Sequence, residues 1–248
     1  QRISQLLSNI FPDNILNEFG NNNKFSPKRV ENGVVLFTDF VDFSSKAKRV
    51  KPLQLLKKLE KYFIRFDEVI EKYNLEKIKT IGDAYMALSG VTENKPKSAV
   101  RACLAAIEIR DFMRKERDIA IAMKNDFWEI RIGLHMGPLV AGIIGTSKYS
   151  FDVWGDTVNI ASRAENASKR GHITVTASIQ ERVTKYFELN SRGDIEIHKR
   201  GGSIEMFYLE KIKDLYRLDN EGSQANSLLR SICHLPSMDF SRMRVHIL

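Results

Sequence analysis

Apolar positions in the first half of the chain form strand-length runs in some segments and follow helical spacing in others. Residues 34–40 form a nearly continuous apolar run with β-branched and aromatic side chains, which is typical of a central strand covered on both faces. Residues 52–73 begin with a proline suited to the first turn of a helix and carry apolar residues at helical spacing. Residues 75–80 and 84–88 predict two strands joined by a hairpin turn at Ile81-Gly82-Asp83.

The second half of the chain continues with segments of the same kinds. A long helix is predicted over about 97–123, and strands are expected near 129–134 and 139–144, on either side of Met136-Gly137-Pro138. A helix over about 157–167 is followed by short strands and another helix. Two late strands and a short closing helix complete the series: 194–198, 204–209 and 227–235.

The order of these elements predicts the fold class. The series β-α-β-β-α-β, followed by additional strands and helices, is the ferredoxin-like arrangement of an α+β protein. We expect this core domain to cover residues 30–212. Residues 1–29 are interpreted as an N-terminal helix and a polar linker, because helical periodicity gives way there to an asparagine-rich stretch. Residues 213–248 lose the alternating pattern and are interpreted as a C-terminal extension.

Composition narrows the class of protein. With 43% hydrophobic and 28% charged residues over 248 positions, the chain has the composition of a globular protein and enough length for a full core. The net charge of +8 favours anionic partners, but the basic residues are scattered, which argues against a nucleic-acid interface. No apolar run reaches the length of a membrane span. Cys103 and Cys233, far apart and outside any CxxC pattern, indicate a reducing compartment without disulfides or zinc.

Two aspartates stand out as candidate metal ligands. Asp39 interrupts the most apolar run of the chain, where an ionised carboxylate is costly unless a cation meets it. Asp83 lies at the tip of the predicted hairpin, which in a βαββ unit reaches the end of the first strand. Two carboxylates brought together repel each other unless a divalent cation lies between them, as in phosphoryl-transfer chemistry. Taken singly, Asp39 also fits an exposed strand end and Asp83 an ordinary turn.

A third candidate feature lies on the predicted helix over 157–167. Asn159 and Arg163 are four residues apart, so one helix face presents an amide and a guanidinium together. Such a pair suits a phosphate, or negative charge that develops on a transferred phosphorus. The same spacing is common on ordinary solvated helix faces, and spacing alone does not separate the two interpretations.

Four segments, taken together and in this order, closely resemble the class III nucleotidyl cyclases. They are FTDFVDFS (37–44), KIKTIGDAYMALSG (77–90), RIGLHMGPLVAGIIG (131–145) and FDVWGDTVNIASR (151–163). The resemblance covers about residues 33–210 and implies the cyclase fold, a palm-like ferredoxin core with additions. It also implies an adenylate or guanylate cyclase, a phosphorus–oxygen lyase.

The resemblance implies roles for residues near the first strand. Asp39 and Asp83 match the two carboxylates that bind two divalent cations, Mg²⁺ or Mn²⁺, with help from the Phe40 carbonyl. The turn that holds the β- and γ-phosphates at a helix start corresponds to four consecutive residues: Val41, Asp42, Phe43 and Ser44.

Further resemblances concern the ribose and the phosphates. Asn159 matches the residue that positions the ribose, and Arg163 the one that stabilises the phosphate in the transition state. The family usually supplies another lysine from a late Lys-Gly-Lys-Gly turn. This chain has Lys199-Arg200-Gly201-Gly202 instead, so Lys199 is the first candidate for binding the triphosphate and Arg200 the alternative.

The choice of base is implied by Lys79 and Asp152. In this family a Lys/Asp pair at these positions marks adenylyl cyclases, whereas guanylyl cyclases carry Glu and a Cys-like residue. The chemistry agrees, because a lysine donates to adenine N1 and an aspartate accepts from the exocyclic amine, while guanine presents the reverse pattern. ATP is therefore the expected substrate, and cyclic AMP and pyrophosphate are the expected products.

The family's sites lie at a dimer interface, with the metal carboxylates from one chain and the Asn/Arg pair from the other. Because this chain carries both sets, the resemblance implies a homodimer with two equivalent sites. It further implies a cytoplasmic output domain of a signalling protein. An upstream sensor is expected outside this chain, with residues 1–19 as a signalling helix, and membrane attachment of the parent protein through a region outside this chain stays open.

Three other functions compete with adenylate cyclase. A guanylate cyclase is the nearest. A catalytically quiet nucleotide-binding module that regulates by dimerisation is disfavoured, because neither a metal carboxylate nor Arg163 is missing. Polymerase-like and diguanylate-forming palm domains also place two metal carboxylates on a βαββ unit. Here, however, Gly82-Asp83 is followed by Ala84-Tyr85, so the GGDEF-type hairpin of the latter is absent.

Overall fold

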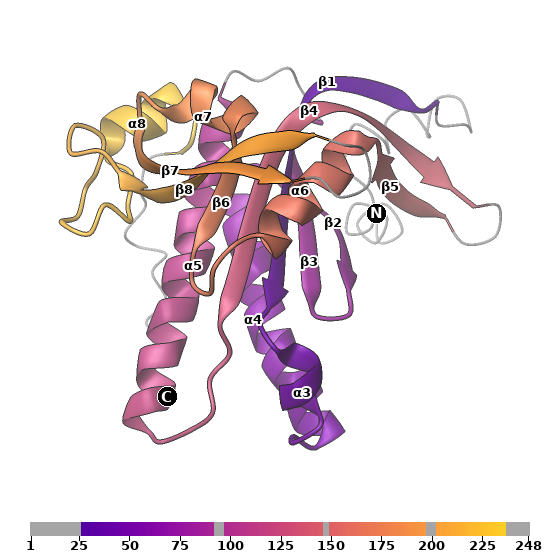
Figure 1. The fold of residues 1–248 in the computed structure, drawn as a ribbon, viewed down its shortest axis with the longest axis vertical. Helices are drawn as coiled ribbons and strands as arrows, with labels where there is room; N and C mark the ends of the chain where they lie inside the picture. Colours follow the sequence, from indigo (N-terminus) through magenta and orange to yellow (C-terminus); the bar gives the residue numbers. More distant parts are fainter. Residues whose placement is uncertain (1–25, 92–96, 146–148, 197–201, 237–248) are drawn as a thin grey trace, which may run out of the picture.

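The structure, a computed structural model, describes residues 26–91, 97–145, 149–196 and 202–236 (Figure 1). Its strands are β1 (Lys28–Phe40), β2 (Glu76–Ile81), β3 (Ala84–Ser89), β4 (Ile130–Ile144), β5 (Ser150–Trp154), β6 (Ile173–Thr176), β7 (Phe187–Glu196) and β8 (Ser203–Ile212). Its helices are α3 (Phe43–Ala47), α4 (Pro52–Lys72), α5 (Ser98–Ala122), α6 (Asp156–Asn166), α7 (Ala177–Val183) and α8 (Ser227–Ile232).

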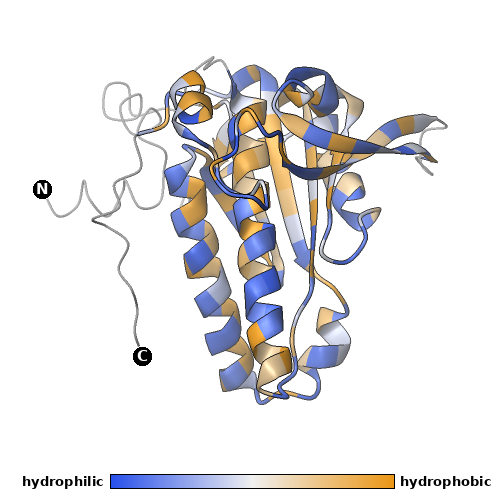
Figure 2. Ribbon diagram, turned by 90° about the vertical axis from the view of Figure 1, so that its left-hand side faces the viewer, coloured by the Kyte–Doolittle hydropathy of each residue, from blue (hydrophilic) through white to orange (hydrophobic). Residues whose placement is uncertain are grey.

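One mixed sheet organises these elements, in the strand order β2-β3-β1-β4-β6-β8-β7, with β5 paired to β4. Its first four strands and the helices α4 and α5 form the predicted β-α-β-β-α-β unit, in which β1 pairs with β3 and β4 in antiparallel fashion. The two long helices lie on one face of the sheet, with mostly hydrophilic residues turned outward and a largely hydrophobic sheet behind them (Figure 2). The α+β, ferredoxin-like prediction is confirmed.

Alternation along β1 divides its side chains between two hydrophobic clusters. Leu36 and Phe40 belong to the main core under α4 and α5, whereas Val35 and Phe37 belong to a second cluster on the opposite face with α6 and β5. Because side chains alternate along a strand, Asp39 lies on the same face as Val35 and Phe37. The carboxylate therefore emerges beside α6, away from the main core.

Aromatic packing fixes the end of β1, from which the candidate site begins. The Phe40 ring lies 5.3 Å from that of Trp128 and 5.7 Å from that of Tyr62, measured between centroids. Phe40 is 2% exposed. Burying an aromatic ring of this size stabilises the fold by roughly 2–3 kcal/mol, so the backbone next to Asp39 is held firmly.

Helix α6 packs directly on the backbone of β4. A Cβ atom added at Gly133 would lie 2.0 Å from the backbone nitrogen of Glu165 and 2.7 Å from the carbonyl carbon of Ala164. Only a glycine allows the helix to approach this closely. The approach brings the inner face of α6 against the strand that neighbours β1.

Most predicted elements are confirmed to within a few residues, but β4 corrects one prediction. Instead of two strands around Met136-Gly137-Pro138, a single strand runs from Ile130 to Ile144. Pro138 has no N–H to donate to a neighbouring strand. Directly opposite it, the pairing of β1 with β4 is irregular between Val30 and Gly33, so the hydrogen bonding between these two strands needs no donor at Pro138. The proline is thus accommodated by a matching irregularity in its neighbour.

Two other boundaries, and one whole strand, differ from the sequence-based expectations. β1 begins at Lys28 rather than near residue 34, and β7 begins at Phe187 although a strand was expected only from Asp194. β5, which pairs only with β4, was not predicted. The expected N-terminal helix, and the last two positions of the strand expected over 194–198, lie outside the described residues.

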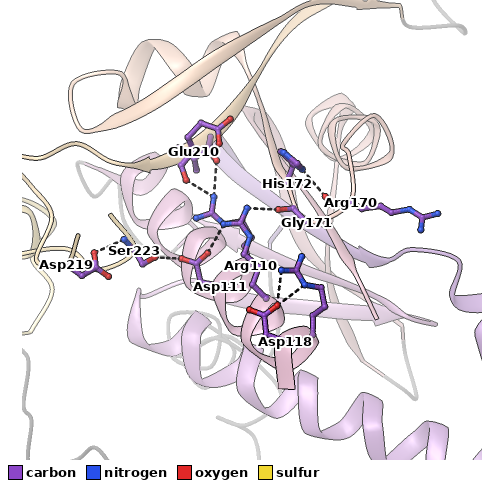
Figure 3. Close-up of polar contacts among 12 residues, drawn as sticks. Arg110, Asp111, Asp118, Arg170, Gly171, His172, Glu210, Asp219 and Ser223 are labelled. Carbon is purple, nitrogen blue, oxygen red and sulfur yellow. Dashed lines mark hydrogen bonds and ion pairs between the residues drawn. The ribbon is translucent and has the colours of Figure 1, made fainter. Parts of the chain in front are cut away.

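The segment that follows β8 packs on the main core. Tyr216, Leu229 and Cys233 belong to the same hydrophobic cluster as the helices and the sheet. Figure 3 shows polar contacts of α5 with β8 and with this segment: Arg110 of α5 donates to the Glu210 carbonyl of β8, 2.6 Å away, and Ser223 of the segment donates to Asp111 of α5 at 2.5 Å. Both cysteines of the chain are free and buried.

None of the helices in the described part of the chain is long and apolar enough to cross a bilayer.

We predict that Gly133→Ala lowers the free energy of unfolding by about 3 kcal/mol or more, because the new methyl group meets backbone that cannot rotate away. Gly142→Ala on the same strand is the matched control, since its Cβ would lie 3.3 Å from the Trp154 side chain and in ordinary van der Waals contact with Pro27, at 3.7 Å or more. The control should change stability by less than about 1 kcal/mol. Urea denaturation measures both, and equal effects would contradict the close packing of α6 on β4.

Candidate active site

The candidate site begins where β1 ends and the β2–β3 hairpin turns. Asp39 lies near the end of β1, and Asp83 follows Gly82 at the tip of the hairpin, beside it because β1 and β3 are paired as far as Thr38 and Tyr85. Burial, the negative charge of Asp39 and a hydrogen bond with Asp39 raise the pKa of Asp83 to about 6. Hydrogen bonds from the backbone N–H groups of Asp83 and Phe40 lower it only in part. The structure thus brings these two carboxylates together.

This carboxylate pair fits a divalent cation. Two oxygen-rich side chains lie together in partial burial, and their mutual repulsion is the kind that a cation relieves. Within the described residues no group of three or more His, Cys, Asp or Glu side chains is arranged to hold a metal. The remaining ligands would therefore be backbone, water or substrate oxygens, which is the coordination that Mg²⁺ favours at phosphate sites.

A third carboxylate, that of Glu165, is linked to Asp39 through Arg131. Arg131 of β4 donates through Nη2 to Asp39 Oδ2 at 2.9 Å, while its Nε lies 2.9 Å from Oε1 of Glu165 on α6. The Glu165 side chain is only 6% exposed. Burial and the charges of Asp39 and Asp83 outweigh the attraction of Arg131, so that the pKa of Glu165 is raised to about 7.

Sequence reasoning assigned no role to Arg131 or Glu165. A signal for Glu165 existed, because on a helical wheel it falls on the inner face of α6 with Ala161 and Ala164, all of them buried. A charged residue among buried positions of an amphipathic helix requires a partner.

The turn after β1 leaves two backbone donors without helical acceptors. Asp42 has a φ of 57° and forms the N-cap of α3, where its carbonyl accepts from the N–H groups of Ser45 and Lys46. Phe43 and Ser44 begin the helix, so their N–H groups have no intrahelical partner. The Asp42 carboxylate forms an ion pair with the Arg170 guanidinium at 2.7 Å, so its negative charge already has a cationic partner.

Lys79 and Asp152 meet although 73 positions separate them in the chain. The Lys79 Nζ lies 2.5 Å from Asp152 Oδ2, joining β2 to β5 across the face that carries the second hydrophobic cluster. The other oxygen, Oδ1, accepts from the Val153 N–H at 2.8 Å, so the carboxylate is held at both ends. The structure thus brings together the two residues expected to contact the base.

Asn159 and Arg163 project from the outer side of α6. At 100° per residue they lie roughly opposite Ala161 and Glu165, which face the sheet. Asn159 is exposed and Arg163 is half-buried. In the described part of the chain, no hydrogen bond or ion pair links either of them to the Asp39–Asp83 pair. Lys199 and Arg200 lie outside the described residues.

Comparison with known protein families agrees with the fold. The profile of the family described as "Adenylate and Guanylate cyclase catalytic domain" matches residues 25–211. The chain therefore belongs to this family and is a class III cyclase catalytic domain.

Individual relatives include cyclases of both specificities. An adenylate cyclase of Mycobacterium tuberculosis is 32% identical over 209 residues, which is 84% of this chain and 46% of the relative. A receptor-type guanylate cyclase of Caenorhabditis elegans is 30% identical over 85% of this chain and 20% of its own length. The chain thus spans less than half the length of these relatives.

Solved structures agree with the family assignment. The guanylate cyclase domain of RhGC from Catenaria anguillulae, in complex with GTP, is similar with a TM-score of 0.69 and 28% identity. The similarity covers 75% of this chain and all of that domain.

We predict that Glu165→Gln alters the pH dependence of stability. The carboxyl has a pKa of about 7 in the fold against an ordinary 4.5, so the folded protein retains a proton that the unfolded chain releases between these values. Wild-type stability should therefore fall as pH rises from 5 to 8. The variant should lose that component and gain, relative to wild type, on the order of 2 kcal/mol between pH 5 and 8.

Urea denaturation at pH 5 and pH 8, with a chelator present, measures this difference. Glu68→Gln, at an exposed position on α4, controls for the general effect of removing a charge. A constant offset between wild type and Glu165→Gln at both pH values would contradict the raised pKa.

Proposed function

We propose that this chain is an adenylate cyclase domain that converts ATP to 3′,5′-cyclic AMP and pyrophosphate. The observation that carries the choice of ATP is the contact of Lys79 with Asp152. A guanylate cyclase is the second candidate, because relatives of both kinds match the chain.

The Lys79–Asp152 pair suits adenine because it offers one donor and one acceptor side by side. Lys79 can donate to N1 of adenine, and Asp152 can accept from the exocyclic amine. Guanine presents a protonated N1 and a carbonyl oxygen at these places, so both protein groups would face the wrong partner. A buried mismatch of this kind rejects a ligand strongly.

The residues of a complete site would come from two copies of the chain. Asp39 is linked through Arg131 to Glu165 on the inner side of α6, and Asp83 lies beside Asp39. Asn159 and Arg163 project from the outer side of the helix. A second copy related by a two-fold axis can place its Asn159 and Arg163 opposite the carboxylates of the first. The arrangement then repeats with the roles exchanged, which gives a homodimer with two equivalent sites.

The β4–β5 hairpin offers a surface for such a contact. It carries several large hydrophobic residues that are unusually exposed: Val140, Ile144, Tyr149 and Trp154, at 39%, 59%, 49% and 37%. Clustered apolar side chains of this size favour burial against a partner.

The chain's own residues would bind and orient ATP for an in-line displacement at the α-phosphorus. Two divalent cations, Mg²⁺ or Mn²⁺, held by Asp39 and Asp83 with the Phe40 carbonyl, would activate the 3′-hydroxyl and neutralise the phosphates. Asn159 would hold the ribose, and Arg163 would stabilise charge on the transferred phosphorus. The proton of the 3′-hydroxyl would pass to the Asp39 carboxylate or to water.

Other groups would bind the triphosphate. The free N–H groups of Phe43 and Ser44 suit phosphate oxygens at the start of α3, next to Val41 and Asp42. Lys199, or alternatively Arg200, would neutralise the departing pyrophosphate. The domain would serve as a cytoplasmic signalling output under the control of an upstream sensor.

We predict that the purified chain makes cyclic AMP from ATP with Mg²⁺ or Mn²⁺ and little cyclic GMP from GTP. Lys79→Glu combined with Asp152→Cys should lower the ATP rate at least about tenfold and raise the share of GTP turnover, because donor and acceptor are exchanged. Mass spectrometry of the cyclic nucleotides measures both products.

Asp83→Ala is the control, and neither nucleotide should be turned over by it. Cyclic GMP as the main wild-type product would make the chain a guanylate cyclase instead. A double variant with its ATP preference intact would show that the two residues do not contact the base.

A second prediction tests the shared site. Asp83→Ala and Arg163→Ala should each be inactive alone, whereas an equal mixture should regain about one quarter of wild-type activity. Half of the randomly formed dimers are mixed, and one of the two sites in each is intact. A mixture of Asp83→Ala with Asp39→Ala should stay inactive, because both changes affect the same half-site. No recovery in the first mixture would contradict a site shared between copies.

A further inference from the structure

A cation bound by Asp39 would compete with Arg131 for the Asp39 carboxylate. Its Nη2 hydrogen-bonds to Asp39 Oδ2 at 2.9 Å, so the guanidinium already neutralises one of the two carboxylates proposed to hold metal. Its Nε lies 2.9 Å from Glu165 Oε1, which makes an ion pair, although the two atoms are not aligned for a hydrogen bond. One guanidinium is therefore shared between a carboxylate of the proposed cation site and a carboxylate outside it.

The burial of these groups makes their charge balance important. The side chains of Asp39 and Arg131 are 25% and 24% exposed, and that of Glu165 is 6% exposed. Partly buried charges interact more strongly than charges in open solvent, because water screens them less. Asp39, Asp83 and Glu165 carry three negative charges when ionised, and Arg131 one positive charge. The group therefore lacks two positive charges, which is the charge of one divalent cation.

We propose that Arg131 is the built-in counter-ion of the cation site and that Glu165 is a positioning residue that retains Arg131 when a cation takes its place at Asp39. Glu165 lies on the inner face of α6, and the close packing at Gly133 fixes it beside β4. Arg131 can thus release Asp39 without losing its other carboxylate. The inference rests on the cation site of the proposed function.

Two consequences for cation binding follow from opposite changes in charge. Without the Glu165 carboxylate, Asp39 is the remaining ion-pair partner of Arg131 in the described residues, so the guanidinium competes more strongly with the cation. Without the guanidinium, the cation meets Asp39 free of a competitor. Glu165 therefore affects cation affinity through Arg131.

The experiment measures Mn²⁺ binding to the nucleotide-free protein by electron paramagnetic resonance, which requires no turnover. Glu165→Gln should weaken binding at least fivefold, and Arg131→Met should tighten it at least fivefold. In the Arg131→Met background, adding Glu165→Gln should change the dissociation constant by less than twofold, because Glu165 then has no guanidinium to hold. Circular dichroism establishes that each variant is folded.

Glu108→Gln is the matched control, since Glu108 is a partly buried carboxylate paired with Arg65 and Lys72 on the helical face of the sheet. It should leave Mn²⁺ affinity within twofold of wild type. Unchanged affinity in Glu165→Gln overturns the proposal, as does an equal effect of Glu165→Gln with and without Arg131, which would indicate a direct field effect.

The variants also separate this inference from the proposed function. If wild type binds no Mn²⁺, or if Asp83→Ala binds it as well as wild type, the cation site itself is wrong. If Asp83→Ala abolishes binding but Glu165→Gln does not weaken it, the cation site stands and only the role of Glu165 falls. Should Glu165→Gln fail to fold, the Arg131→Met variant alone tests the proposal. If its Mn²⁺ affinity is no higher than that of wild type, the counter-ion role of Arg131 is overturned.

Discussion

The packing of α6 on the bare backbone of β4 at Gly133 is the constraint on which the site depends. It lets Glu165 reach Arg131, and through Arg131 the helix is tied to Asp39 at the end of β1. The same helix necessarily turns Asn159 and Arg163 the other way, since they lie on the opposite side of the helical wheel. One backbone contact thus fixes which residues of α6 face the sheet and which face away from it.

The alternation of strands and helices could be predicted from the sequence, because hydrophobic spacing reports directly on burial. The meeting of Asp39 with Asp83 was also predictable, since a βαββ unit brings the hairpin tip to the first strand. The continuity of β4 was not, because the irregularity in β1 that tolerates Pro138 is a property of the pairing between two distant segments.

Long-range ion pairs mark the limit of sequence-based reasoning at the site. Arg131 and Asp39 are 92 positions apart, and no spacing rule connects them. Lys79 and Asp152 could be associated only through resemblance to a family, and the strand that carries Asp152 was not predicted. The Lys79–Asp152 contact and the Arg131 counter-ion both depend on how the strands of the sheet lie beside each other, which local sequence patterns do not encode.

The packing of the C-terminal segment bears on the order in which this chain folds as it is synthesised. Leu229, Cys233 and Leu235 complete a core whose other members begin at Val34 of β1. A nascent chain that has emerged only to the end of β8 lacks these three members of the core. Because synthesis proceeds from the N-terminus, this core closes only after residues 229–235 have left the ribosome.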